Sequence, residues 1–337
     1  MSKLDIRQEE RIKNKWSKAK KWIGGILAIV VIVTISAIGF GGNYLYNLAL
    51  NPDTPKDMIF ASTESNNDVV TINGTSGPVS ISSQKWLLEQ SGYEDFYMTS
   101  RDGLKLHNYL IKKPNTNKWA ITVHGYTSEG KLTASYAKNF FDMGYNVIIP
   151  DLRGHGSSEG DYIGMGWDER IDIIDLINYI IKEDSDAEIV LFGVSMGAST
   201  VMNVSGEKLP SNVKAIIADC GYTSVWDEFA YQLKELFGLP PFPMLYVANI
   251  ITRVRAGYWI NGDSSIGQVS KSNTPTLFIQ GDKDTFVPAY MVDELYNASS
   301  APKKKLIIEG AGHAKSNKVD PQLYWQTIDK YLNKYVN

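Results

Sequence analysis

One serine in this chain stands in a sequence context typical of nucleophilic chemistry. Ser195 is the middle residue of segment 193–197 (GVSMG), which follows an apolar run and precedes an expected helix. A serine in such a strand-to-helix turn adopts a strained backbone conformation that raises its hydroxyl above the sheet, and flanking glycines remove the side chains that would clash there. The start of the helix also favours negative charge that develops nearby. The segment therefore predicts that Ser195 is a nucleophile.

A serine hydroxyl needs a base at neutral pH, and His313 is the candidate. It lies in the sequence GAGHA, directly after the last apolar run. A carboxylate must fix the tautomer of the histidine and stabilise its positive charge. The loop GDKDTFVP offers Asp282 and Asp284 after the preceding apolar run, and Asp219 follows an earlier one. The residues alone leave these three carboxylates open.

Two backbone N–H groups are expected to stabilise the oxyanion that forms when a serine attacks a carbonyl. The sequence VHGY ends at Tyr126 and follows an earlier apolar run. The N–H groups of Tyr126 and Met196 are the expected donors, since backbone donors need no particular side chain. We interpret His124 as a residue that orders this loop, and Cys220 as a small buried core residue.

Short apolar runs that alternate with amphipathic segments must position these residues. This alternation predicts an α/β protein, with a mostly parallel sheet and helices on both faces. The loops at the carboxyl ends of the strands then meet at one edge of the sheet, where ligands gather. We expect helices over 132–143, 169–182, 288–298 and 321–335, with another from residue 195, and strands over 96–99, 104–111, 119–124, 146–151, 188–193, 213–219, 275–281 and 304–310.

The alternation stops at about residues 221–271, a stretch that is rich in aromatic residues. An insertion of this length between two strands usually has a function. We interpret it as a helical lid over a cleft, and the alternative is additional helical core.

The amino end has the pattern of a membrane anchor. Residues 22–40 are 19 uncharged, mostly apolar residues, and as a helix they would span roughly 28 Å, close to the thickness of a bilayer core. Residues 1–21 carry a net charge of +5, which predicts a cytoplasmic amino terminus and an extracytoplasmic main body. The alternative is a cleaved signal peptide and a secreted protein.

These patterns divide the chain into a basic tail (1–21), a transmembrane anchor (22–40), a tether that leads into the domain (41–90) and a catalytic domain (91–337). Residues 62–83 are rich in Ser, Thr, Asn and Gly without helical periodicity, so we expect a loop or a loosely attached piece there.

Composition excludes several classes of protein. The chain is 43% hydrophobic and 21% charged, which argues against wholesale disorder. Its single cysteine excludes an intramolecular disulfide and a Cys-rich metal site, and its four histidines are too scattered for a structural zinc cluster. Residues 22–337 carry a net charge of −8, which disfavours nucleic-acid binding. We expect neither a metal nor an organic cofactor.

The motifs together resemble the α/β-hydrolase superfamily, and within it the bacterial membrane-anchored or secreted serine hydrolases of the esterase and serine aminopeptidase-like branch. The resemblance covers about residues 95–335, and the order of serine, acid and histidine along the chain also agrees with it. It implies the α/β-hydrolase fold, with Ser195 as nucleophile, Asp284 as acid and His313 as base. It further implies that segment 151–157 is structural, with Arg153 and His155 bracing the site. The matching pieces are VHGY (123–126), DLRGHGS (151–157), GVSMG (193–197), GDKDTFVP (281–288) and GH (312–313).

The expected reaction is a two-step acyl transfer to water through an acyl-enzyme. The aromatic insertion favours an apolar acyl or aryl group, so a small carboxylic ester is the first substrate class. A serine at the elbow argues against dehalogenation and epoxide opening, for which relatives use an aspartate. The same three residues could also serve a peptidase, an amidase or an acyltransferase. The alternative without catalysis is a binding protein on a hydrolase fold.

Overall fold

The computed structural model describes residues 3–60, 78–262 and 264–337 and contains one eight-stranded sheet. The strand order is β1-β2-β4-β3-β5-β6-β7-β8; β1 and β4 pair antiparallel with β2, and the remaining neighbours are parallel. The prediction of a mostly parallel sheet is therefore confirmed. The strands are β1 (Tyr93–Thr99), β2 (Lys105–Ile111), β3 (Lys118–Val123), β4 (Asn146–Pro150), β5 (Glu188–Val194), β6 (Val213–Asp219), β7 (Thr276–Gly281) and β8 (Lys303–Ile308).

Helices cover both faces of the sheet, and for this reason its central strands are mostly apolar and buried. All residues of β5 and β7 are buried. Neighbouring residues of β5 belong to two different cores: Leu191 packs on one face and Val190 on the other. The edge strand β1 is mostly exposed and carries charged residues, which discourage pairing with another chain.

The helices that flank the sheet lie close to the predicted positions. The expected helix at 132–143 is divided into a 3₁₀ turn (η1, Gly130–Thr133) and α4 (Ala134–Asp142). The short α11 (Ser316–Val319) was not predicted. The other helices of this group are α5 (Glu169–Glu183), α6 (Met196–Ser205), α10 (Tyr290–Ala298) and α12 (Pro321–Leu332).

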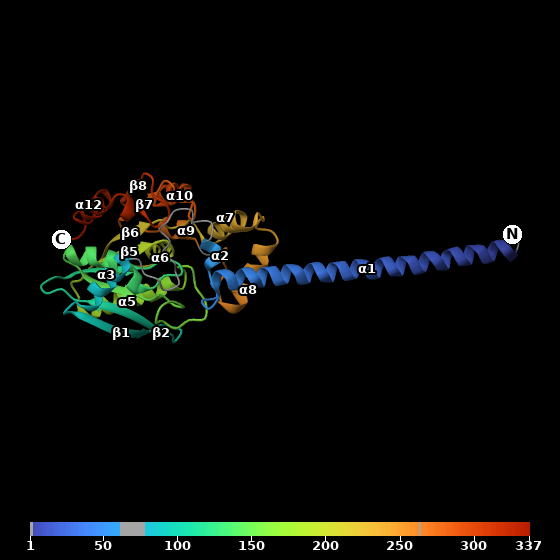
Figure 1. Ribbon diagram of the computed structural model, residues 1–337, viewed down its shortest axis with the longest axis horizontal. Helices are drawn as coiled ribbons and strands as arrows, with labels where there is room; N and C mark the ends of the chain where they lie inside the picture. The colour runs from blue at the N-terminus through green and yellow to red at the C-terminus, as the bar shows by residue number, and fades with distance from the viewer. Residues whose placement is uncertain (1–2, 61–77, 263) are drawn as a thin grey trace.

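The insertion between β6 and β7 forms three helices, α7 (Val225–Phe237), α8 (Met244–Arg255) and α9 (Ser265–Val269). Ser224 caps α7 by accepting a hydrogen bond from the Asp227 N–H, and Gly238 ends it in the left-handed conformation, with φ 65°. Figure 1 shows α7 and α8 at the end of the domain from which the long helix α1 emerges.

Helix α1 (Lys3–Leu50) contains the predicted anchor at 22–40 and continues beyond it. Its apolar part is a candidate membrane span by length and composition, with a mean hydropathy of 2.6 and none of that window buried. The helix does not end at Phe40, because residues 41–50 dock on the domain and Leu50 is fully buried. A Cβ at Gly41 would lie 2.6 Å from the Met244 Sδ, so the missing side chain lets α1 and α8 approach closely.

The expectation of a tether from residue 41 is therefore wrong for residues 41–50, which are part of a packed helix. Two short helices follow, α2 (Asp57–Phe60) and α3 (Pro78–Leu88). The expected loop at 62–83 is wrong where it overlaps α3, and its part at 62–77 lies outside the described residues.

Lys56 fixes the C-terminal end of α1. Its ammonium group donates hydrogen bonds to the carbonyl oxygens of Leu48 and Asn51, both at 2.7 Å, and of Asn47 at 3.3 Å. A cation favours this end of a helix, where carbonyl groups have no intrahelical partner. Burial lowers the pKa of Lys56 to about 8. The end of α1 is thus held in one position on the domain.

Candidate active site

Ser195 lies between β5 and α6 in a strained backbone conformation, with φ 57° and ψ −120°. Its own N–H donates a hydrogen bond to the carbonyl oxygen of Asp219 at 2.8 Å, which ties the turn to β6. A Cβ at Gly193 would clash with the backbone of Gly197, and one at Gly197 would clash with the carbonyl oxygen of Val123. Both glycines are therefore required for the close packing of this turn.

The structure brings Ser195, His313 and Asp284 into one hydrogen-bonded chain. The His313 Nε2 lies 2.8 Å from the Ser195 Oγ, and the His313 Nδ1 lies 2.8 Å from the Asp284 Oδ2. Since a carboxylate accepts hydrogen bonds, Nδ1 carries the ring proton and Nε2 is left to accept the proton of the serine hydroxyl. This is the geometry that general-base activation of a serine needs.

Asp284 is held by more donors than the histidine alone. Its Oδ1 accepts hydrogen bonds from the backbone N–H groups of Phe286 and Val287, both at 2.9 Å. Its Oδ2 accepts one from the Gln280 amide at 2.8 Å. Gln280 was missed in the sequence, although it carries a polar amide at the end of the apolar run of β7.

The environment of His313 favours its protonated form. Burial opposes a charge on the imidazole, but the adjacent Asp284 carboxylate outweighs this effect. The pKa of His313 is therefore held well above its ordinary value of 6.5. The ring is thus a stronger base than a histidine in water.

The two rival carboxylates have other partners. Asp219 accepts a hydrogen bond from the Tyr324 hydroxyl at 2.8 Å, and burial raises its pKa to about 7. Asp282 accepts a hydrogen bond from the Gly310 N–H at 2.6 Å and so closes the loop against β8. The ring nitrogen of His313 faces Asp284.

The loop after β3 runs beside the serine. A Cβ at Gly125 would lie 3.2 Å from the Ser195 Cβ. His124 donates from Nδ1 to the Gly125 carbonyl oxygen at 2.8 Å and accepts at Nε2 from the Leu152 N–H at 3.0 Å. Burial lowers the pKa of His124 to about 4, so the ring is neutral, and these bonds order the loop.

The two backbone groups expected to stabilise an oxyanion come from the elements around Ser195. Tyr126 follows Gly125 in the loop after β3, and its side chain reaches α1, where the hydroxyl donates to the Ala49 carbonyl oxygen at 2.7 Å. Met196 is the first residue of α6. Its N–H therefore belongs to the turn of a helix in which N–H groups have no intrahelical partner.

Segment 151–157 is an ion-paired loop beside β4. Arg153 is buried and donates two hydrogen bonds to Asp172 of α5, both at 2.8 Å, and one to Asp102 at 2.9 Å. Burial lowers the pKa of His155 to about 3, so this ring is neutral. The hydrogen bond between His107 Nδ1 and Asp151 Oδ2, at 2.7 Å, was missed in the sequence.

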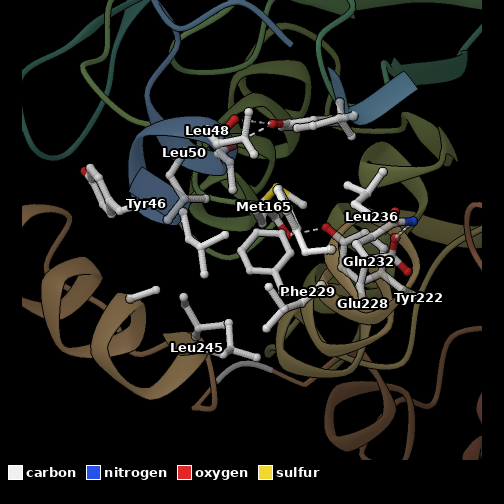
Figure 2. A pocket seen from close by; sticks show the side chains of 18 of the residues that line it. Tyr46, Leu48, Leu50, Met165, Tyr222, Glu228, Phe229, Gln232, Leu236 and Leu245 are labelled. Carbon is white, nitrogen blue, oxygen red and sulfur yellow. Dashed lines mark hydrogen bonds between the residues drawn. The ribbon is translucent and has the colours of Figure 1, made fainter. Parts of the chain in front are cut away.

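An apolar pocket opens beside Ser195, with a cavity volume of about 80 Å³. Figure 2 shows side chains of α1 on one side of the hollow and those of α7 on the other. The contribution of α1 was missed, since its residues 45–50 were expected in a tether. The lining residues are Leu45, Tyr46, Leu48, Ala49, Leu50, Ile59, Tyr126, Met165, Ser195, Tyr222, Glu228, Phe229, Gln232, Leu233, Leu236, Phe237, Leu245, Ala248, Ile260 and Phe286.

Glu228 of α7 is the one carboxylic acid among these lining residues. Its Oε1 accepts a hydrogen bond from the Gln232 amide at 3.0 Å, and within the described part of the chain its buried Oε2 has no partner. Burial raises the pKa of Glu228 to about 8. At neutral pH the pocket therefore holds a neutral carboxylic acid, a group that sequence reasoning missed.

One group of side chains has the composition of a metal site. The ligand atoms of Cys220, Asp284 and His313 lie within 4.8 Å of one another. Burial raises the pKa of the Cys220 thiol to about 11, whereas a metal ligand must be a thiolate. Asp284 and His313 are already bonded to each other and to Ser195. These residues fit a proton relay better than a metal centre.

The chain matches the model of a known protein family over a range that includes Ser195. The family model described as serine aminopeptidase, S33, matches residues 114–264, which include Ser195 and exclude Asp284 and His313. The chain is 27% identical to the uncharacterized protein YqkD of Bacillus subtilis over 91% of this chain and 96% of the relative. It is 26% identical to the alpha/beta hydrolase domain-containing protein WAV2 of Arabidopsis thaliana over 72% of this chain and 79% of the relative.

Solved structures resemble the whole globular part. The Pyrococcus furiosus esterase Pf2001 has a TM-score of 0.62 at 23% identity, covering 78% of this chain and 98% of the esterase. Est1E of Butyrivibrio proteoclasticus, solved with ferulic acid bound, has a TM-score of 0.56 at 21% identity, covering 72% of this chain and 99% of Est1E. Similarity at this level of identity establishes the shared fold, and the predicted fold class is confirmed.

Proposed function

We propose that this chain, which has the α/β-hydrolase fold, is a serine hydrolase that cleaves a carboxylic ester. In this proposal Ser195 is the nucleophile, His313 the general base and acid, and Asp284 the carboxylate that orients His313. The backbone N–H groups of Tyr126 and Met196 stabilise the oxyanion. The observation that carries the proposal is the continuous hydrogen-bonded chain from the Asp284 carboxylate through His313 to the Ser195 hydroxyl, with 2.8 Å at each step.

The reaction follows from this chain in two balanced steps. The Ser195 Oγ attacks the ester carbonyl while His313 Nε2 takes the hydroxyl proton. The C–O bond to the alcohol breaks, His313 returns the proton to the alcohol, and the acyl group remains on Ser195. Water then gives a proton to His313 and attacks the acyl-enzyme, and the acid leaves as Ser195 regains its proton. Asp284 stabilises the imidazolium in both steps.

The pocket supports an ester with an apolar acyl group. Its walls are mainly aliphatic and aromatic, as is typical of sites that hold apolar organic groups. An aminopeptidase must hold a substrate ammonium group, for which a carboxylate is the natural partner. Glu228, with a pKa of about 8, is neutral at pH 7 and provides no such charge. The match to the serine aminopeptidase model makes peptide cleavage the second candidate.

The proposed setting is the outer face of a membrane. The apolar helix α1 would be the anchor, and the basic residues before it would keep the amino end in the cytoplasm. The helices α7 and α8 would serve as the lid of the pocket, since both line it.

Fluorophosphonate labelling of intact cells tests the serine and its exposure together. Wild-type protein should be labelled, and Ser195→Ala should not. A set of p-nitrophenyl esters beside aminoacyl arylamides then identifies the reaction, and we expect turnover of the esters. Faster cleavage of the arylamides would favour the peptidase, and absence of labelling in purified, folded protein would reject the serine hydrolase.

A further inference from the structure

The helix expected to cross the membrane also forms a wall of the active-site pocket. Leu45, Leu48 and Ala49 of α1 line the same cavity as Ser195. A helix rises 1.5 Å per residue, so these residues lie only about 8–14 Å beyond Phe40, where the predicted span ends. The pocket is therefore within reach of the headgroup layer, which adds several ångströms on each side of the hydrocarbon core.

Contacts between α1 and α8 place the start of α8 at the same level as the end of the span. Met244, the first residue of α8, packs against Gly41, and Val247 packs against Gly42. Arg255, the last residue of α8, donates to the Asn47 Oδ1 at 3.1 Å. Helix α8 thus leaves the membrane surface alongside α1, and the connection from α7 to α8 lies closest to the span (Figure 1).

The outer face of this segment is apolar. Phe242 is 70% exposed, and Tyr246, Ile250 and Val254 follow at four-residue spacing with exposures of 50%, 55% and 80%. Residues four apart lie on one face of a helix, so Tyr246, Ile250 and Val254 form an apolar stripe on α8, and Phe242 extends this stripe before the start of the helix. The opposite face of the same helix carries Leu245, which lines the pocket.

We propose that the substrate is an acyl ester of a membrane glycerolipid, which enters the pocket directly from the leaflet on the domain's side of the membrane. The apolar stripe, defined by Phe242 and by Tyr246, Ile250 and Val254 of α8, begins at that leaflet with Phe242 and continues the apolar surface of the span along α8. The acyl chain passes between α1 and the α7–α8 segment, and the ester carbonyl reaches Ser195. This inference rests on the proposed serine hydrolase function and specifies its substrate class.

The bilayer is the occupant of the stripe because the stripe continues the surface of the span. Apolar side chains next to a membrane-spanning helix have a lower free energy in the membrane interface than in water. The pocket walls come from α1, α7 and α8, the elements at this interface, and the Tyr44 and Phe237 rings join α1 to α7 with centroids 6.4 Å apart. A lipid chain would exchange one apolar environment for another along this route.

The test uses the full chain in vesicles of phosphatidylethanolamine and phosphatidylglycerol. Two substrates are measured in the same sample: fatty acid released from the vesicle lipid, and p-nitrophenyl acetate added from water. Ile250→Lys and Phe242→Gln should lower fatty-acid release about tenfold, since burial of one large apolar side chain is worth about that factor or more. Both variants should hydrolyse the acetate at the wild-type rate, because neither residue lines the pocket.

The matched control is Leu323→Lys. Leu323 is 43% exposed and belongs to α12, a helix at the end of the domain away from α1 (Figure 1). This control variant should leave both rates unchanged, and Ser195→Ala should abolish both. Acetate hydrolysis without fatty-acid release by the wild type would overturn the lipid inference and leave the serine hydrolase standing. Wild-type fatty-acid release in both Ile250→Lys and Phe242→Gln would overturn direct entry from the leaflet. If the wild type turned over neither substrate and resisted fluorophosphonate, the proposed function itself would fail.

Discussion

Two neighbouring strands end next to the same histidine, and each supplies a buried aspartate with a different environment. Asp219 at the end of β6 accepts a hydrogen bond from Tyr324, and its pKa is raised to about 7 by burial. Asp284, in the loop after β7, accepts hydrogen bonds from two backbone N–H groups, from Gln280 and from His313. A buried carboxylate stays ionised only where donors replace water. Both aspartates follow the end of a strand, so this position does not distinguish them. The hydrogen-bond donors around the carboxylate do, and they favour Asp284 as the proposed partner of His313.

The largest expected effect comes from removing the charge of Asp284. Asp284→Asn should lower kcat/KM for an ester by roughly 10³–10⁴-fold, because the imidazolium loses its counter-charge and the tautomer is no longer fixed. In the wild type kcat/KM should rise with pH through the pKa of His313, which is above 6.5. In the variant the largest effect that raises the pKa of His313 is gone and only the weaker effect of Cys220 still opposes burial, so this acid limb should move to lower pH. A pH–rate profile of both proteins measures the shift, and an unmoved limb would contradict the assignment of Asp284.

A smaller effect, on stability, is expected for Asp219→Asn. The pKa of Asp219 is raised to about 7 in the folded state, so the wild type loses stability as pH rises from about 4 through 7. The asparagine variant lacks this loss and should be more stable than the wild type at pH 9, by on the order of a few kcal/mol, with little gain at pH 4. Urea unfolding at the two pH values measures the difference, and equal gains at both would refute this explanation.

Two further measurements sharpen the interpretation of Asp219→Asn. The Ser195 N–H bonds to the backbone oxygen of residue 219, so kcat/KM should change less than tenfold. Asp282→Asn is the matched control, because the Asp282 side chain is partly exposed and closes a loop. It should show no comparable gain at pH 9. A loss of activity in Asp219→Asn as large as in Asp284→Asn would break the comparison.

The smallest effect concerns Glu228, the carboxylic acid of the pocket. Its pKa is raised to about 8 by burial, so above that pH a negative charge appears beside the apolar substrate. The KM of the wild type for a long-chain ester should therefore increase several-fold between pH 7 and pH 9. Glu228→Gln should keep the KM at pH 7 and remove most of this increase. Steady-state kinetics measure KM at the two pH values. If Glu228 does not face the substrate, KM should change equally between pH 7 and pH 9 in the wild type and in Glu228→Gln.

Much of the fold could be predicted because local pattern determines it. The central strands are short apolar runs with turn residues at both ends, and the tight turn at Ser195 requires its two flanking glycines. The choice of Asp284 among three carboxylates could not be made from residue types alone. It depends on how the loop after β7 folds back, so that Phe286 and Val287 point their N–H groups at the carboxylate.

The role of the end of α1 was missed for a different reason. Two glycines and an uncharged sequence at 41–50 are compatible with a helix end, a linker or a packed helix. The helix continues because α8, which is distant in the sequence, lies against Gly41 and Gly42, and because Lys56 folds back to bind the last carbonyl groups. Tertiary contacts of this kind leave no periodic signal.

The continuous α1 has a practical consequence for anyone who wishes to purify this enzyme without detergent. Shortening the chain at residue 51 or 91 would remove an entire wall from the cavity and the carbonyl group that Tyr126 holds. Cleavage between Phe40 and Gly41, or a shortened protein that begins at Gly41, would instead remove the exposed apolar part of α1 and keep residues 41–50, which pack on the domain. The proposed anchor and a wall of the proposed active-site pocket thus belong to one continuous helix, and the junction after Phe40 is where the two can be separated.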